Sequence, residues 1–162
     1  RQTRRLWTDD LNYGHRRYQR TLAYAQSKLA NLMFARELQR RLDEALSPLR
    51  SYAVHPGVSG TDLFTRTETP IDFFGKGFAS VWGHRPTKAA ESILFGATEP
   101  DADPHLYWGP TGGLGQSRGP VRSAPSSKLS EDRDLWRRLW DASEAMTNVT
   151  YRLPRPVDEA AR

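Results

Sequence analysis

The feature that most constrains the fold is a long apolar helical segment followed at once by a short strand. Residues 21–45 contain neither proline nor glycine, and their first half is apolar on almost every side. Thr21 is a candidate N-cap, and Ser47-Pro48 stops the helix. A helix that is apolar all round must be buried on more than one side. The segment therefore predicts a helix inside a layered structure, with packing partners beyond a single sheet.

The residues after this helix predict an α/β fold. A strand pattern at 50–55 ends at Pro56-Gly57, and a helix is expected at 87–98. A second strand is expected at 105–108, before a Gly/Pro/Ser-rich loop at 109–127. Helix, short turn, strand and glycine turn is the order of parallel sheets covered by helices.

The last predicted helix covers residues 131–146, with Ser130 as candidate N-cap. Its spacing gathers six residues on one face: Leu135, Trp136, Leu139, Trp140, Ala142 and Ser143. The pattern as a whole predicts three helices and two strands.

Composition limits the class of protein. At 162 residues with 37% hydrophobic residues, the chain predicts one globular domain. No run approaches the roughly 18 apolar residues that cross a bilayer, so no membrane span is expected. The absence of cysteine excludes disulfides, thiolate zinc sites and cysteine nucleophiles, and it favours a reducing compartment such as the cytoplasm.

The positive charge is concentrated in the first part of the chain. The net charge is +5, and residues 1–50 hold eleven Lys and Arg against five Asp and Glu. The basic residues are scattered among acids, and no Cys/His finger or aromatic RNA-binding motif is present. We interpret this half as a solvated surface and expect no nucleic-acid partner, although such an excess could also attract a polyanion.

Tyr24 and Lys28 are the candidate catalytic residues. Residues four apart on a helix lie one above the other, so the ammonium is within reach of the phenol. A free tyrosine has a pKa near 10, and a nearby positive charge favours its phenolate form. Tyr24 could then act as general acid or base at neutral pH, with Lys28 tuning it. The pair alone is a weak signal because the same spacing arises by chance.

The order of the motifs is more specific than any one of them. The run YAQSKLANLMFARELQRRL followed by YAVHPGVSGTDL resembles the catalytic helix and following strand of the short-chain dehydrogenase/reductase family. The chain is most like the retinol-dehydrogenase and protochlorophyllide-reductase-like branch. The likeness continues through KAAESILFGAT, LYWGP and LWRRLWDASEAMTNV, so it covers about residues 7–151.

This resemblance implies an NAD(P)-dependent oxidoreductase that interconverts an alcohol and a ketone or aldehyde. Tyr24 would exchange the proton with the substrate oxygen, and Lys28 would also bind the ribose hydroxyls of the cofactor. Pro56 and Gly57 would line the nicotinamide ring. NADP is favoured over NAD by likeness, and no metal is implied.

Two further cofactor contacts follow from the same resemblance. Val58 and Thr61 would hold the carboxamide and the neighbouring phosphate. The aromatic-rich residues 62–85 match the variable substrate region of the family, which suggests a small apolar substrate. Buried core is an equally fair interpretation of these aromatics. The family also pairs its catalytic helix with the copy in a second subunit, which suggests a homodimer through residues 21–45.

The dinucleotide-binding half of the family has no counterpart here. That half begins with a strand, a glycine-rich turn and a helix, well upstream of the tyrosine. Only residues 1–23 precede Tyr24. We therefore expect residues 1–150 to be the C-terminal half of a Rossmann-type, doubly wound parallel sheet, followed by a flexible tail at 151–162. We expect the 162 residues alone to lack turnover.

One glycine-rich stretch imitates the phosphate loop of that missing half. Gly109 to Gly115 has the spacing GxxxGxG after a short strand. A phosphate loop needs a helix after it, and Pro120 and Pro125 instead interrupt the chain. We interpret the stretch as a loop. A different class of function stays open beside the enzyme: a non-catalytic remnant or interaction module that binds a protein partner or polyanion.

Overall fold

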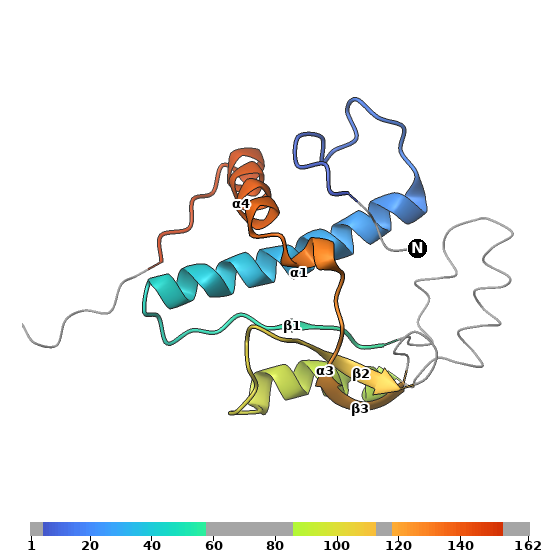
Figure 1. Ribbon diagram of the computed structural model, residues 1–162, viewed down its shortest axis with the longest axis vertical. Helices are drawn as coiled ribbons and strands as arrows, with labels where there is room; N and C mark the ends of the chain where they lie inside the picture. Colours follow the sequence, from blue (N-terminus) through green and yellow to red (C-terminus); the bar gives the residue numbers. More distant parts are fainter. Residues whose placement is uncertain (1–4, 58–85, 113–117, 154–162) are drawn as a thin grey trace, which may run out of the picture. The chain divides into compact units, whose positions relative to one another are not determined.

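The computed structural model describes residues 5–57, 86–112 and 118–153, and the chain divides into two compact units (Figure 1). The first unit comprises Arg1–Ser51 and Ser126–Arg162, and the second comprises Tyr52–Pro125. The first is helical, and the second contains the sheet. The α/β fold class predicted from the sequence is confirmed.

The first unit is built on one long helix. Its elements are α1 (Arg20–Glu44), the 3-10 turn η2 (Lys128–Glu131) and α4 (Arg133–Thr147), and both later elements pack against α1. Leu6 of the lead-in segment, Met33 of α1 and Leu139 of α4 form the buried core. The apolar helix thus finds partners in segments far away in the sequence, as its composition predicts.

Two predicted helix caps are wrong. α1 begins one residue earlier than expected, at Arg20, because the amide of Ala23 already donates to the carbonyl of Gln19. Thr21 therefore lies inside the helix and caps nothing. Ser130 is not the cap of α4 either, since it lies within η2, and the carboxylate of Asp132 accepts from the first amides of α4 instead.

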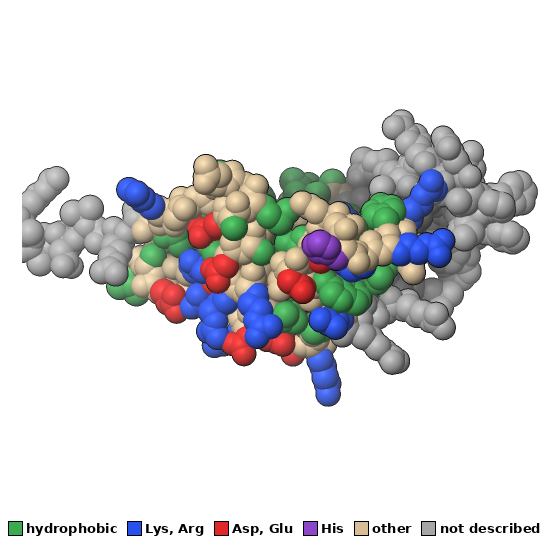
Figure 2. All heavy atoms as spheres, turned by 90° about the horizontal axis from the view of Figure 1, so that it is seen from above, with side chains coloured by type: hydrophobic (Ala, Val, Ile, Leu, Met, Phe, Trp, Pro, Cys, Tyr) green, Lys and Arg blue, Asp and Glu red, His purple; other side chains and the backbone are tan. Residues whose placement is uncertain are grey.

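A buried carboxylate stabilises the second half of α1. Glu37 is fully buried, and its Oε1 and Oε2 accept hydrogen bonds from Arg40 at 2.7 and 2.8 Å. Arg41 donates to Oε1 at 2.8 Å and lies 4.4 Å from the Trp140 ring of α4. Burial alone would raise the pKa of the Glu37 carboxyl, but hydrogen bonds and charge from the two arginines outweigh it and lower that pKa. Figure 2 shows a face of the molecule on which basic and acidic side chains are interspersed.

The described residues of the second unit form a small mixed sheet with a helix packed on it. β1 (Ala53–Val54) pairs in parallel with β2 (Tyr107–Gly112), which pairs in antiparallel with β3 (Arg118–Ser123). The register aligns Ala53 with Tyr107, and Val54 with Trp108. α3 (Pro86–Thr98) packs on the sheet.

The loop predicted at 109–127 is wrong in part. Its first part extends β2, and residues 118–123 form the antiparallel edge strand β3. A bulge interrupts the pairing between Pro110 and Gly112, and Gly119 has a positive φ of 104°. Gly and Pro are depleted in strands, so this hairpin carries no propensity signal. An antiparallel edge strand on an otherwise parallel sheet is common in α/β folds.

Candidate active site

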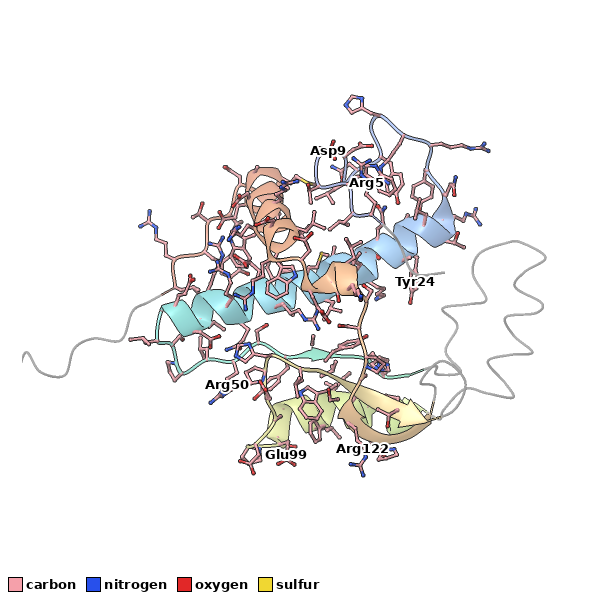
Figure 3. All side chains as sticks on the ribbon, viewed as in Figure 1. Arg5, Asp9, Tyr24, Arg50, Glu99 and Arg122 are labelled. Carbon is pink, nitrogen blue, oxygen red and sulfur yellow. The ribbon has the colours of Figure 1, made fainter. Side chains whose placement is uncertain are left out.

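Tyr24 and Lys28 lie one turn apart on the exposed side of α1. The Lys28 Nζ atom is 5.4 Å from the centre of the Tyr24 ring, and Tyr24 is 46% exposed. Figure 3 shows Tyr24 projecting from α1 away from the segment that carries Arg5 and Asp9. Among the described residues, neither the phenol oxygen nor the ammonium has a hydrogen-bond or ion-pair partner. The pair is therefore accessible to a ligand.

Gln26, between these two residues in sequence, is buried and anchors the lead-in segment to α1. Its Oε1 accepts from the Tyr13 hydroxyl at 3.3 Å and from Arg16 Nη2 at 3.1 Å. Its Nε2 donates to the carbonyl of Arg5 at 3.3 Å. Because the lead-in segment is tied to Gln26, it leaves the Tyr24 side of the helix exposed.

The lead-in segment is itself organised around Asp10. Its carboxylate accepts from the amides of Gly14 and His15 and from Arg16 Nε, the last at 3.1 Å. Burial would raise the pKa of the Asp10 carboxyl, but these hydrogen bonds and the charge of Arg16 lower it. The Arg16 guanidinium also lies over the Tyr13 ring, 3.8 Å from its centre. A segment that the sequence pattern describes only as irregular is thus fixed by side-chain contacts.

The other predicted site residues follow β1 in the second unit. Pro56 and Gly57 come just after the parallel strand, at the end where ligands bind in such sheets. Gly57 has a φ of 74°, which a residue with a side chain rarely adopts, and its amide donates to His55 Nδ1 at 3.3 Å. Burial lowers the pKa of the His55 imidazole below its usual value near 6.5. Val58, Thr61 and the aromatics from Phe64 to Trp82 lie outside the described residues.

Two other kinds of feature are absent from the described part of the chain. None of its helices has the length and apolar content that crossing a membrane requires. It likewise contains no group of three or more His, Asp or Glu side chains that could hold a metal ion.

Comparison with known proteins shows what the chain is related to. No family model matches it. It is 33% identical over 145 residues to a polyprenol dehydrogenase from Danio rerio, covering 90% of this chain and 42% of that protein. It is 32% identical over 152 residues to retinol dehydrogenase 13 from Homo sapiens, covering 87% and 41%. A short chain dehydrogenase/reductase from Gibberella zeae is 30% identical over 138 residues, covering 83% and 37%.

A solved structure has the same fold. The crystal structure of an uncharacterized protein from Mycobacterium paratuberculosis matches with a TM-score of 0.70 and 35% identity, covering 92% of this chain and 47% of that one. Over most of its length the chain is thus similar to retinol and polyprenol dehydrogenases and to a short-chain dehydrogenase/reductase. The resemblance drawn from the motifs is confirmed, and the family is one of oxidoreductase enzymes.

The chain spans about two fifths of the length of the curated relatives it matches, between 37% and 42% of the three above. Tyr24 and Lys28 stay predictions as catalytic residues because no comparison assigns them a role. Sequence reasoning assigned no role to two further residues, the buried Gln26 of the first unit and His55 of the second. The available signal for Gln26 was a polar residue within an apolar stretch of helix.

Proposed function

We propose that this chain carries the proton-transfer residues of a nicotinamide-dependent oxidoreductase that interconverts an alcohol and a ketone or aldehyde. The observation that supports it is the exposed pair on α1, in which the Lys28 ammonium lies 5.4 Å from the centre of the Tyr24 ring. Its setting is a chain similar to dehydrogenases. We place residues 1–150 in one half of the catalytic domain, with a flexible tail at 151–162.

In this proposal Tyr24 Oη moves the proton. During reduction the phenol donates its proton to the carbonyl oxygen of the substrate, and during oxidation the phenolate accepts the proton of the alcohol. The Lys28 ammonium stabilises the negative charge left on Oη, because a nearby positive charge favours the phenolate form. The cofactor, when bound, supplies or accepts the hydride.

The residues present fit a nicotinamide dinucleotide. The Lys28 ammonium, which has no ion-pair partner among the described residues, can donate to ribose hydroxyls, and Gly57 presents bare backbone where a ring needs a close approach. We assign Pro56 beside Gly57, and Val58 and Thr61 after them, to the same cofactor. NADP is the preferred form.

The substrate in this proposal is a small apolar alcohol or carbonyl compound. Support for its apolar character comes from the relatives, whose names specify polyprenol and retinol. We also propose that α1 pairs with its copy in a homodimer. Because the chain spans about two fifths of its relatives, we propose that the 162 residues alone do not turn over substrate.

The test is Tyr24→Phe in the natural protein that contains this chain, with Tyr18→Phe as matched control. Tyr18 is a second exposed tyrosine on the lead-in segment. Loss of the phenol proton should lower kcat about 10²- to 10⁴-fold, the usual contribution of a general acid or base, while the Kd for NADPH stays unchanged. Tyr18→Phe should keep full activity.

Lys28→Met separates the two tasks given to the lysine. It should weaken NADPH binding as well as lower kcat, whereas Lys128→Met, at an exposed lysine of η2, should do neither. A Tyr24→Phe protein with unchanged kcat would refute the proposal. A natural protein with no dehydrogenase activity to lose would favour the interaction-module alternative.

A further inference from the structure

The imidazole of His55 occupies the space where a side chain at position 109 would begin. A Cβ built on Gly109 would lie 2.1 Å from both Cδ2 and Nε2 of His55, and 2.7 Å from Cε1. No real Cβ makes such contacts, and the obstruction is a ring instead of a flexible chain end. Gly109 is therefore the seat of the His55 ring, and any other residue there must displace it.

The other edge of the same ring holds the turn after β1. His55 Nδ1 accepts the amide of Gly57 at 3.3 Å, which leaves the ring proton on Nε2. The backbone of His55 is fixed in turn because its amide donates to the carbonyl of Trp108 at 2.9 Å. The Tyr107 ring packs against the imidazole with 4.9 Å between ring centres. The ring is thus clamped between β2 and the turn.

We propose that His55 is a positioning residue that sets the backbone of Pro56-Gly57 for the nicotinamide cofactor, with Gly109 as its seat. This inference rests on the proposed function, which places the nicotinamide against that turn. It also accounts for the first glycine of the GxxxGxG stretch without a phosphate: position 109 must lack a side chain for a reason of packing.

The environment of His55 keeps it suited to this task. Only a neutral imidazole has the Nδ1 lone pair that accepts the Gly57 amide, and burial favours the neutral form. The Nε2 atom is buried and has no hydrogen-bond partner among the described residues. An apolar residue of similar size at position 55 could not accept the Gly57 amide, so the Nδ1 atom is the feature of His55 that holds the turn.

The experiment is a double-mutant cycle with NADPH binding as readout, measured by fluorescence titration of the natural protein without any turnover. His55→Ala should raise the Kd for NADPH about fivefold to tenfold, the equivalent of one lost neutral hydrogen bond. His55→Asn should restore the Kd to within about twofold, because its Oδ1 stands close to the position of Nδ1 and accepts the same amide.

The seat is tested by Gly109→Ala. Alone it should raise the Kd as much as His55→Ala does, because the new methyl group displaces the ring. In the His55→Ala background it should add little, since the ring that it would displace is gone. His105→Ala, at an exposed histidine of the same unit, is the control and should leave the Kd unchanged.

Three results would overturn the inference while leaving the proposed function intact: a His55→Ala protein that binds NADPH as tightly as wild type, no rescue by His55→Asn, or additive effects of the two alanine substitutions. A wild-type protein that binds no nicotinamide dinucleotide would instead remove the proposed function, and this inference with it.

Discussion

The two units of this chain are stabilised by different kinds of contact. In the first unit, polar side chains are buried against one another: Glu37 lies under two arginines, and Gln26 joins three groups of the lead-in segment. In the second unit, close approach depends on missing side chains. Gly109 leaves room for the His55 ring, and a Cβ on Gly96 of α3 would lie 3.1 Å from a methyl group of Val54 in β1.

Because of this difference, we expect each unit to be sensitive to a different kind of substitution. Removing a partner from a buried polar group leaves it unsatisfied, so the first unit should respond to changes of charge and hydrogen bonding. Adding one methyl group to tightly packed backbone forces atoms apart, so the second unit should respond to Gly→Ala. The candidate catalytic pair lies in the first unit, and the turn proposed to hold the cofactor lies in the second.

The largest expected effect on stability comes from removing both arginine partners of the buried Glu37 carboxylate. Replacing Arg40 and Arg41 together with Met leaves Glu37 buried without a cation, which should lower the free energy of unfolding by about 3–5 kcal/mol. Urea denaturation of the natural protein at pH 7 measures it. Arg137→Met is the matched control, because it removes an exposed ion pair with Asp134 and should cost less than about 1 kcal/mol. Equal effects of the two changes would contradict the contrast.

The same variant has a distinctive pH dependence. In the wild type the pKa of Glu37 lies below its usual value of 4.5, so its contribution to stability is complete above pH 4.5 and is lost as the pH falls through the lowered pKa. In the double variant burial acts unopposed and raises that pKa. Protonation then relieves the penalty, so the stability difference from wild type should narrow as the pH falls from 7 to 4.5. A constant or widening difference would contradict this account.

The second largest expected effect on stability comes from adding a single methyl group in the second unit. Gly119 has a φ of 104°, and a Cβ there would lie 3.1 Å from the backbone nitrogen of Gly112, so Gly119→Ala should cost about 2 kcal/mol. Gly14→Ala in the first unit is the control. Among the described residues its Cβ would meet only Asp10 Oδ1, at 3.6 Å, and the change should stay within about 0.5 kcal/mol. Hydrogen exchange shows which amides lose protection, and those of β2 and β3 should lose it first. A Gly14 variant as unstable as the Gly119 variant would break the contrast.

The sequence predicts the helices better than the strands, for reasons visible at particular residues. The helix expected at 21–45 is α1 within one residue because the segment lacks proline and glycine and is rich in Ala, Leu, Arg, Gln and Glu. The strand expected at 50–55 shortens to Ala53–Val54, because pairing with β2 is confined to those residues. β3 was missed because its register depends on a bulge and a positive φ at Gly119, which are properties of the folded hairpin.

The candidate site was predictable where it depends on local spacing. Tyr24 and Lys28 meet because residues four apart share a helix face. The seat of His55 could not be found in this way, because it joins residues more than fifty positions apart, and the sequence shows Gly109 only as part of a glycine-rich stretch. Contacts of this kind depend on strand pairing, so they become visible only with the fold.

The smallest expected effect on stability concerns the start of α1, where a side-chain hydrogen bond is missing. Gln19 has the extended backbone of an N-cap, with φ −128° and ψ 116°, but its side chain makes no capping hydrogen bond, and the first turn contains no acidic residue. α4, by comparison, is capped by Asp132. If side-chain hydrogen bonds limit the stability of the first unit, Gln19→Asp should raise the free energy of unfolding by about 0.5–1 kcal/mol. Thermal denaturation with fluorescence detection is sensitive enough to measure it.

Two further variants separate the capping hydrogen bond from the interaction of the carboxylate with the helix dipole. Asp132→Gln should lower stability by about 1 kcal/mol, because α4 then loses its cap. Gln19→Ser supplies a hydroxyl oxygen without a charge, so the difference between the Ser and Asp variants measures the interaction of the carboxylate with the helix dipole, and it should shrink in high salt. No gain from either Gln19 variant would mean that water already satisfies the first amides of α1. The stability of this unit would then reside in its buried polar contacts, with no contribution to be gained at its exposed helix end.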